Sequence, residues 1–283
     1  MSWPFLARRN LSKPFLAFLF FLYGWIYCCP LTGISLLSSQ SAGMGGINCF
    51  QTSVWSVCSN QAGLAAMRGP QTGMHYENRY MLSQTAGKAA AVAFPAGKTY
   101  FGGCYSAFGY SLYSEGRTSL AAARRLAQKV SAGIGMNYHF VRAPTTGNRE
   151  QLFTAEAGMI ADAADHLKVS FHLANPWIQR SKLRAMPFVS PVLTAGVAYI
   201  ERETMVALAF SSDVSGDHKL MAGISQQLSA NCIVRAGAAP LSAEYGFGMG
   251  VLFGRIHCDV SFLSHLRLGF CPYLSLAYDL FAK

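Results

Sequence analysis

The sequence is poor in charged residues, which make up 13% of the chain, whereas an average soluble domain has about 25%. No acidic residue precedes Glu77. Apolar residues make up 52% of the chain and aromatic residues 13%. This composition excludes a disordered chain, which needs high charge and few aromatic residues. It also leaves too little charge to cover a soluble protein of 283 residues. The composition therefore indicates a membrane protein.

Long charge-free apolar stretches are also missing from most of the chain. A membrane-spanning helix needs about 20 consecutive apolar residues. After Arg68, the longest windows without charge are residues 99–114 and 185–200, each 16 residues long. The first is rich in Gly and Ser, and the second contains Pro187 and Pro191. Spanning helices are therefore excluded for this part of the chain.

The N-terminus does contain an apolar run. Arg8, Arg9 and Lys13 precede residues 14–29, which are apolar, and a small, polar region follows. This order is typical of a secretory signal peptide. We therefore assign residues 1–40 to a signal peptide and leader, with an uncleaved N-terminal anchor as the alternative.

The rest of the chain alternates between apolar and small or polar residues. In residues 130–141, Ile134 and Met136 belong to an apolar face, and Gly135 and Asn137 belong to the opposite face. This period of two, apolar outward and polar inward, is typical of a transmembrane β-strand. The last segment, residues 274–280, repeats it.

Strands of this kind predict the architecture of residues 70–283. The pattern indicates about fourteen, an even number as bacterial outer-membrane barrels require. They cover residues 71–80, 86–95, 99–110, 115–125, 130–141, 150–161, 166–174, 192–200, 203–211, 218–227, 231–238, 244–253, 256–264 and 274–280. We predict an all-β fold, a transmembrane antiparallel β-barrel, whose closure satisfies every backbone polar group in lipid. A soluble β-sandwich is the alternative.

Residues 41–69 precede the barrel, and residues 41–67 carry no charge and no regular strand period. They contain Gly-Met-Gly-Gly at 43–46 and Asn-Gln-Ala-Gly-Leu at 60–64. This segment resembles the N-terminal signature of the FadL-like outer-membrane barrels, and more closely that of their PorV/PorQ branch in the Bacteroidetes. Gln61 stands where that family usually has Pro. The residues that carry the resemblance, together with a nearby tryptophan, are Gly43, Met44, Gly45, Gly46, Trp55, Asn60, Ala62, Gly63 and Leu64.

The resemblance implies a barrel of about fourteen strands with residues 41–69 folded inside as a small plug or hatch. It also implies a non-enzymatic protein of the outer membrane of a diderm bacterium. The first functional hypothesis is an accessory or scaffold barrel of the type IX secretion system, with secretion components as partners. The second is FadL-like transport of small hydrophobic molecules. A surface enzyme is the third.

Other chemistry finds little support in the sequence. The eight cysteines form no CxxC pair, although a disulfide between Cys49 and Cys58 is an alternative to their use as small apolar fillers. The seven histidines show no metal-ligand spacing. No GxSxG nucleophile motif occurs. We therefore predict no catalytic, cofactor or metal residues. The net charge of +10 comes from scattered Lys and Arg without a nucleic-acid-binding motif, so outer-membrane lipid is the expected partner of these residues.

Overall fold

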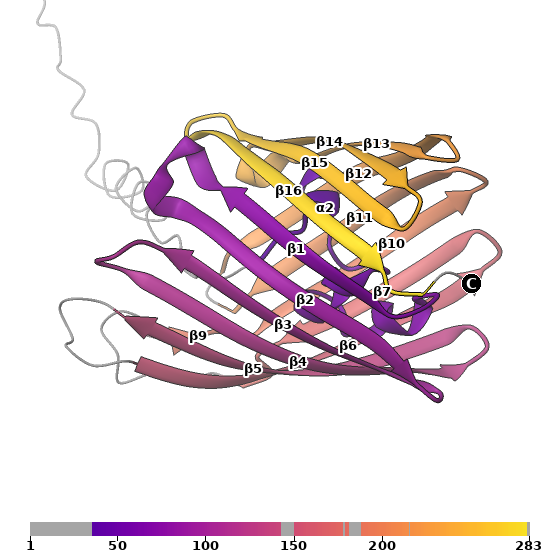
Figure 1. Cartoon of the computed structure of the whole chain (residues 1–283), viewed down its shortest axis with the longest axis horizontal. Coiled ribbons are helices and arrows are strands. Elements are labelled where there is room, and N and C mark those ends of the chain that lie inside the picture. Colours follow the sequence, from indigo (N-terminus) through magenta and orange to yellow (C-terminus); the bar gives the residue numbers. More distant parts are fainter. Residues whose placement is uncertain (1–35, 143–149, 178, 181–187, 215, 282–283) are drawn as a thin grey trace, which may run out of the picture. The chain divides into compact units, whose positions relative to one another are not determined.

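A computed structural model describes residues 36–142, 150–177, 179–180, 188–214 and 216–281. The predicted leader thus lies largely outside the described residues. Within them, fourteen antiparallel strands form a closed barrel, in which β1 pairs with the last strand, β16 (Figure 1). The strands are β1 (Gln71–Asn78), β2 (Ala86–Ala96), β3 (Thr99–Gly109), β4 (Ser114–Ala127), β5 (Val130–Arg142), β6 (Glu150–Ala164), β7 (Leu167–Ala174), β10 (Val192–Glu201), β11 (Thr204–Asp213), β12 (His218–Ser229), β13 (Cys232–Ala239), β14 (Glu244–Phe253), β15 (Ile256–His265) and β16 (Gly269–Asp279). The predicted fold class is confirmed.

The connection between β7 and β10 departs from the sequence prediction. It contains two short strands, β8 (Gln179–Arg180) and β9 (Phe188–Val189), which pair with each other and not with the barrel. Two-residue strands are too short to produce a readable alternation. The strand pattern therefore did not reveal this hairpin.

The two ends of the barrel differ in their connections. At one end, each connection has two residues, as in Gly97-Lys98 between β2 and β3 and Gly254-Arg255 between β14 and β15. Both glycines have a positive φ, 64° and 59°, as tight turns favour. The opposite end has longer connections, which include η3 (Arg79–Met81), η4 (Ser83–Thr85) and η5 (Pro240–Ser242).

Burial along the strands follows the predicted alternation. On β5, Ile134 and Met136 are 65% and 66% exposed, whereas Gly135 and Asn137 are buried. Leu120, which lies opposite Met136 on β4, is 65% exposed. Large apolar side chains thus cover the outer surface, as lipid contact requires. Among the described residues, the helices are all too short to cross a membrane.

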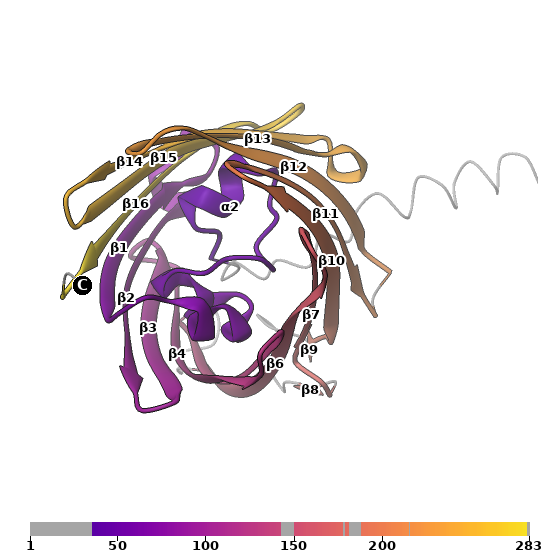
Figure 2. The same cartoon turned by 90° about the vertical axis from the view of Figure 1, so that its right-hand side faces the viewer.

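The chain that precedes β1 lies inside the barrel. We call residues 36–69 the interior segment; it contains α2 (Ser39–Gly43), η1 (Val54–Cys58) and η2 (Gln61–Ala66). Figure 2, a view along the barrel, shows these elements within the ring of strands. Helix α2 contacts β13–β16, η1 contacts β1–β4, and η2 contacts β3–β6. The interior segment therefore follows the inner wall and includes residues 36–40, the last residues of the predicted leader.

Candidate functional site

The barrel wall receives the interior segment at glycines. Among the described residues, eight glycines on eight strands face the segment so closely that an added Cβ would come within 3.0 Å of one of its atoms. Real Cβ atoms essentially never approach so closely, and glycine, which has no Cβ, lets backbone or side-chain atoms of the segment come this near to the strand. These residues are Gly73 on β1, Gly102 on β3, Gly133 on β5, Gly158 on β6, Gly196 on β10, Gly223 on β12, Gly237 on β13 and Gly246 on β14. The wall is therefore shaped to hold the segment around most of its circumference.

Residues 43–46, the first run that resembles the FadL-like signature, end helix α2 and turn the chain along the wall. Gly45 and Gly46 have φ values of 69° and 97°, a region that side chains other than glycine rarely adopt. The Gly45 backbone rests on that of residues 237–238, where an added Cβ would meet the Ala238 nitrogen at 2.5 Å. Met44 is buried against Gly223. These glycines therefore let the segment turn while in contact with two strands.

The second such run, residues 60–64, is held by the Asn60 side chain. Its Oδ1 accepts a hydrogen bond from the Ala62 backbone N–H (3.1 Å), which caps η2. Its Nδ2 donates to Ser170 Oγ on β7 (2.8 Å). Gly63 is required within the segment itself, because an added Cβ would overlap the Gln51 carbonyl oxygen. Leu64 is fully buried. Asn60 thus links the local fold of the segment to the wall.

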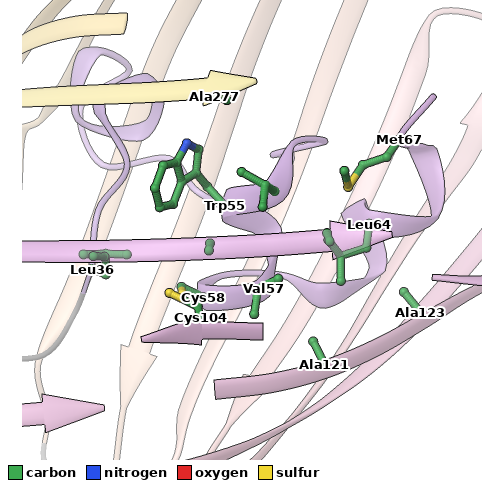
Figure 3. Close-up of a cluster of buried hydrophobic side chains, with 14 of the residues drawn as sticks. Leu36, Trp55, Val57, Cys58, Leu64, Met67, Cys104, Ala121, Ala123 and Ala277 are labelled. Atoms are coloured by element: carbon green, nitrogen blue, oxygen red, sulfur yellow. The ribbon is translucent and has the colours of Figure 1, made fainter. Parts of the chain in front are cut away.

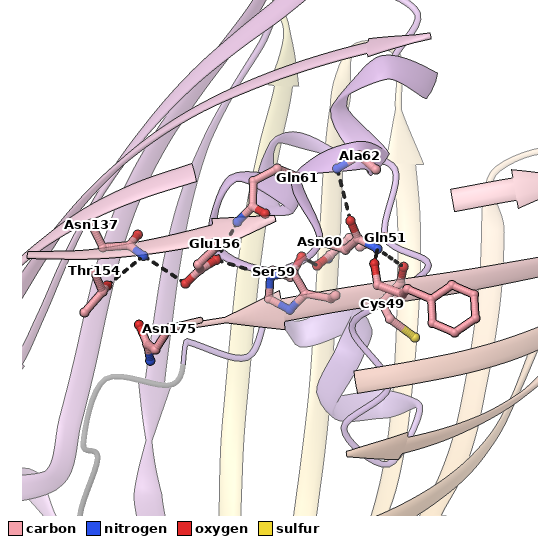
Figure 4. A network of polar contacts seen from close by, with 12 residues as sticks. Cys49, Gln51, Ser59, Asn60, Gln61, Ala62, Asn137, Thr154, Glu156 and Asn175 are labelled. Atoms are coloured by element: carbon pink, nitrogen blue, oxygen red, sulfur yellow. Dashed lines mark hydrogen bonds and ion pairs between the residues drawn. The ribbon is translucent and has the colours of Figure 1, made fainter. Parts of the chain in front are cut away.

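Gln61, which stands where the FadL-like barrels usually have Pro, makes a contact with a buried ion pair. Its Nε2 donates to Glu156 Oε2 at 2.5 Å (Figure 4). The other carboxylate oxygen of Glu156 accepts from Arg117 Nη2 (2.7 Å) and from Asn137 Nδ2 (2.9 Å). His172 Nε2 lies 3.3 Å from Glu156 Oε2. Glu156 lies on β6 and Arg117 on β4, far from Gln61 in the chain, so no local sequence pattern connects them with it.

A second ion pair anchors helix α2 on the far side of the barrel. Arg235 Nη1 on β13 lies 2.6 Å from Asp259 Oδ1 on β15. Gln40 Nε2 of α2 donates to the other carboxylate oxygen of Asp259 (2.9 Å). Close by, Ser39 Oγ donates to Ser261 Oγ (3.0 Å). Polar side chains of the wall therefore fix both the beginning and the end of the interior segment.

Apolar contacts lie between these two anchors. Trp55, 1% exposed, packs over Gly73 and meets the His75 ring edge-on at 5.6 Å between centroids. Around it, the interior segment covers a strip of small side chains on the wall, which we call the alanine strip (Figure 3). It consists of Ala89, Ala91, Ala93, Ala121, Ala123 and Ala277, on β2, β4 and β16. The segment contributes Val54, Trp55, Val57, Leu64 and Met67. An apolar surface therefore lies inside the barrel beneath η1 and η2.

Cys49 and Cys58, considered above as a disulfide pair, are both free and face different parts of the wall. Cys49 faces Gly196 on β10, whereas Cys58 lies beside Cys104 on β3. Burial raises the pKa of the Cys49 thiol to about 12. Cys28 and Cys29 fall outside the described residues. Within the described part of the chain, no group of three potential ligand side chains is placed to hold a metal ion.

Comparison with known proteins gives similarity at the level of the fold. No protein-family model and no curated protein matches the chain. Its structure is similar to that of a TodX deltaS2S3 mutant, a monoaromatic hydrocarbon channel (TM-score 0.72, 11% identity, 87% of this chain and 100% of that chain). It is also similar to the Ralstonia pickettii toluene transporter TbuX (0.66, 9%, 86% and 97%) and to a Pseudomonas aeruginosa FadL homologue (0.56, 11%, 86% and 98%). The chain therefore has the fold of FadL-type barrels.

Proposed function

We propose that the chain is an outer-membrane barrel through which small hydrophobic molecules pass, with the interior segment as its plug. The support is of two kinds. Solved barrels of the same fold include a monoaromatic hydrocarbon channel and a toluene transporter. The outer surface is apolar along the strands, as a lipid-embedded barrel requires.

The alanine strip is the observation that carries this proposal. A hydrophobic molecule needs an apolar surface to leave water, and the strip offers one inside a barrel whose wall is otherwise rich in buried polar groups. The interior segment covers the strip through η1 and η2. A shift of these two short elements away from β2 and β4 would uncover an apolar path along the wall. The cover that the segment gives to the strip is what supports the proposed plug role.

The connections of the barrel suggest its orientation. Outer-membrane barrels have short periplasmic turns and longer extracellular loops. The end with two-residue turns also carries the start of β1 and the end of β16. We therefore place this end in the periplasm and the longer connections, including the β8–β9 hairpin, at the cell surface.

The other two hypotheses are weaker. An accessory role in type IX secretion gains nothing from the structural similarities reported above, which are to hydrocarbon channels and a FadL homologue. The same comparisons favour a transport protein over an enzyme. A PorV/PorQ relationship therefore rests on the sequence resemblance alone.

Uptake of a hydrophobic fluorescent probe tests the transport proposal. In cells that lack the chain, we expect 1-N-phenylnaphthylamine to enter more slowly than in cells that carry it. Nitrocefin, a more polar solute, serves as the control and should enter at the same rate in both strains. Equal entry of the hydrophobic probe would overturn the proposal. Equal acceleration of both solutes would also overturn it, because that result describes an unselective pore.

A further inference from the structure

The interior segment and the barrel wall each bring a cysteine to the same place. Cys58 ends η1, and Cys104 lies in the middle of β3 with its side chain inward. Their thiols are close enough to interact, and both side chains are buried in the cluster around the alanine strip. Figure 3 shows the two sulfur atoms next to each other.

Close approach of η1 to β3 produces this contact. Gly102 lies two residues before Cys104 on the same inward face, and an added Cβ there would clash with the Val57 side chain. Because Gly102 has no side chain, η1 packs directly against β3. Cys58, which follows Val57, then contacts Cys104. The local geometry that places the segment on the wall therefore also brings the Cys58 sulfur next to the Cys104 sulfur.

We propose that Cys58 and Cys104 form a disulfide in the native protein and so tie the interior segment covalently to β3. This inference rests on the proposed outer-membrane placement, because disulfides form and persist in the periplasm and at the cell surface. It goes beyond the transport function, since a transport barrel requires no such bond.

The reaction is a thiol–disulfide exchange with a periplasmic protein disulfide as oxidant. The thiolate of one cysteine attacks the oxidant and releases one of its sulfurs as a thiolate. The second cysteine then attacks the mixed disulfide, which forms the Cys58–Cys104 bond and releases the oxidant as a dithiol. Two electrons pass to the oxidant, and the two thiol protons are lost to it or to water. Burial of both thiols in the folded barrel means that the oxidant acts before the segment has fully docked.

The bond would divide the interior segment into a fixed part and a part that can move. Residues around Cys58 would stay on β3, so with the bond in place only η2 and the chain before η1 could shift, and they would uncover only part of the alanine strip. Reduction would release the whole segment from its covalent tie. The Cys58–Cys104 bond therefore limits which parts of the interior segment can move.

Peptide mapping of the native protein tests the proposal. Protein from outer membranes is treated with N-ethylmaleimide, unfolded in denaturant containing the same reagent, and digested without reduction by trypsin and chymotrypsin. Cleavage after Phe50 or Trp55 separates Cys49 from Cys58, and cleavage after Lys98 and Tyr105 releases a short Cys104 peptide. We expect a Cys58–Cys104 linked peptide that disappears after reduction.

Matched variants assign the bond. Cys58→Ser and Cys104→Ser should each remove the linked peptide, whereas Cys49→Ser, which alters another buried cysteine of the same segment, should leave it in place. Recovery of Cys58 and Cys104 from the native protein as N-ethylmaleimide adducts would overturn the proposal. A link from either residue to a different cysteine would overturn it as well. Even where a variant fails to fold, the mass spectrum of the wild-type protein shows whether Cys58 and Cys104 are linked. This result does not depend on probe uptake, so it tests the disulfide separately from the transport proposal.

Discussion

At the scale of single residues, the small side chains of the wall decide where the interior segment lies. Eight strands present a glycine to it, and the alanine strip faces it where the contact is less close. Each of these positions belongs to the inward half of the strand alternation, so an additional methyl group at a glycine would meet the segment and not lipid. The size of one side chain on the wall is therefore a constraint on the position of the interior segment.

Gly133→Ala tests this constraint. An added Cβ at Gly133 would lie 2.6 Å from the backbone of Gln61 and Ala62, so we expect a loss of about 1–3 kcal/mol in the free energy of unfolding, as for other overpacked sites. Denaturant unfolding in detergent micelles measures this change. Gly103→Ala is the control, because its added Cβ would meet the nearest atom at 3.7 Å. Equal destabilisation by the two substitutions would contradict the prediction.

The buried ion pair between Arg117 and Glu156 is a second residue-scale constraint. The two side chains are 9% and 6% exposed, and Glu156→Ala would leave the guanidinium buried without its carboxylate. We expect a loss of about 3–5 kcal/mol, measured by the same denaturant unfolding.

Asp162→Ala provides the matched control for Glu156→Ala. Asp162 pairs with Lys168 at 2.6 Å, but these side chains are 39% and 41% exposed, so solvent screens the pair and its loss should cost at most about 1 kcal/mol. If Glu156→Ala were as mild as this control, Glu156 would not hold the segment and the wall together.

At the scale of elements, the strands and the interior segment are stabilised in different ways. Each strand is paired on both sides and presents large apolar residues outward. The segment has one short helix and two 3-10 turns, of five or six residues each. Side-chain caps from Ser38 and Asn60 begin α2 and η2. Such elements are too short to be stable alone, so the wall must supply most of their stability.

Arginine substitutions along β4 test the outward, lipid-facing side of the strands. Leu120 and Leu126 are 65% and 66% exposed, but Leu120 lies at the middle of β4 and Leu126 close to its end. Because the cost of a charge depends on depth, we expect Leu120→Arg to lower the free energy of unfolding by about 2–4 kcal/mol and Leu126→Arg by about 0–1 kcal/mol. Unfolding from lipid vesicles measures both values. Equal costs would be inconsistent with a membrane-spanning β4.

At the scale of the whole molecule, closure of the barrel joins the first and last strands. β1 pairs with β16 over residues 71–77 and 273–279, so the described barrel has no free edge and its backbone polar groups are paired, as lipid requires. Closure also surrounds the interior segment, which contacts strands on all sides. The two ends of the barrel differ in the length of their connections, and this difference predicts the orientation.

Epitope insertion tests that orientation. A tag between Gly216 and Asp217, in the β11–β12 connection, should be labelled by antibody on intact cells, because the longer connections are expected to lie outside. A tag between Gly254 and Arg255, in a two-residue turn of the opposite end, should be labelled only after the outer membrane is permeabilised. The reverse labelling pattern would invert the proposed orientation.

The sequence predicted much of the structure of the barrel wall but little of the structure inside it. The alternation of residues 130–141 correctly assigns the two faces of β5, because lipid contact acts on every second residue. Strand ends were predicted less accurately than strand faces. For example, β6 continues to Ala164, beyond the expected end at 161, because the alternation of apolar and polar residues becomes irregular close to a turn. The motif residues 43–46 and 60–64 were found by resemblance, whereas the wall glycines and the Gln61–Glu156 contact were not found.

The sequence by itself determined the kind of surface that this protein presents. Its low charge, the absence of long apolar runs after Arg68, and the period of two define a barrel wall in lipid, because each is a local consequence of what every second residue touches. Only the tertiary structure decided what lies within the wall. The contacts of Gln61 with Glu156, of Cys58 with Cys104, and of the segment with eight wall glycines join residues far apart in the chain, and no local pattern records which inward positions meet once the barrel has closed.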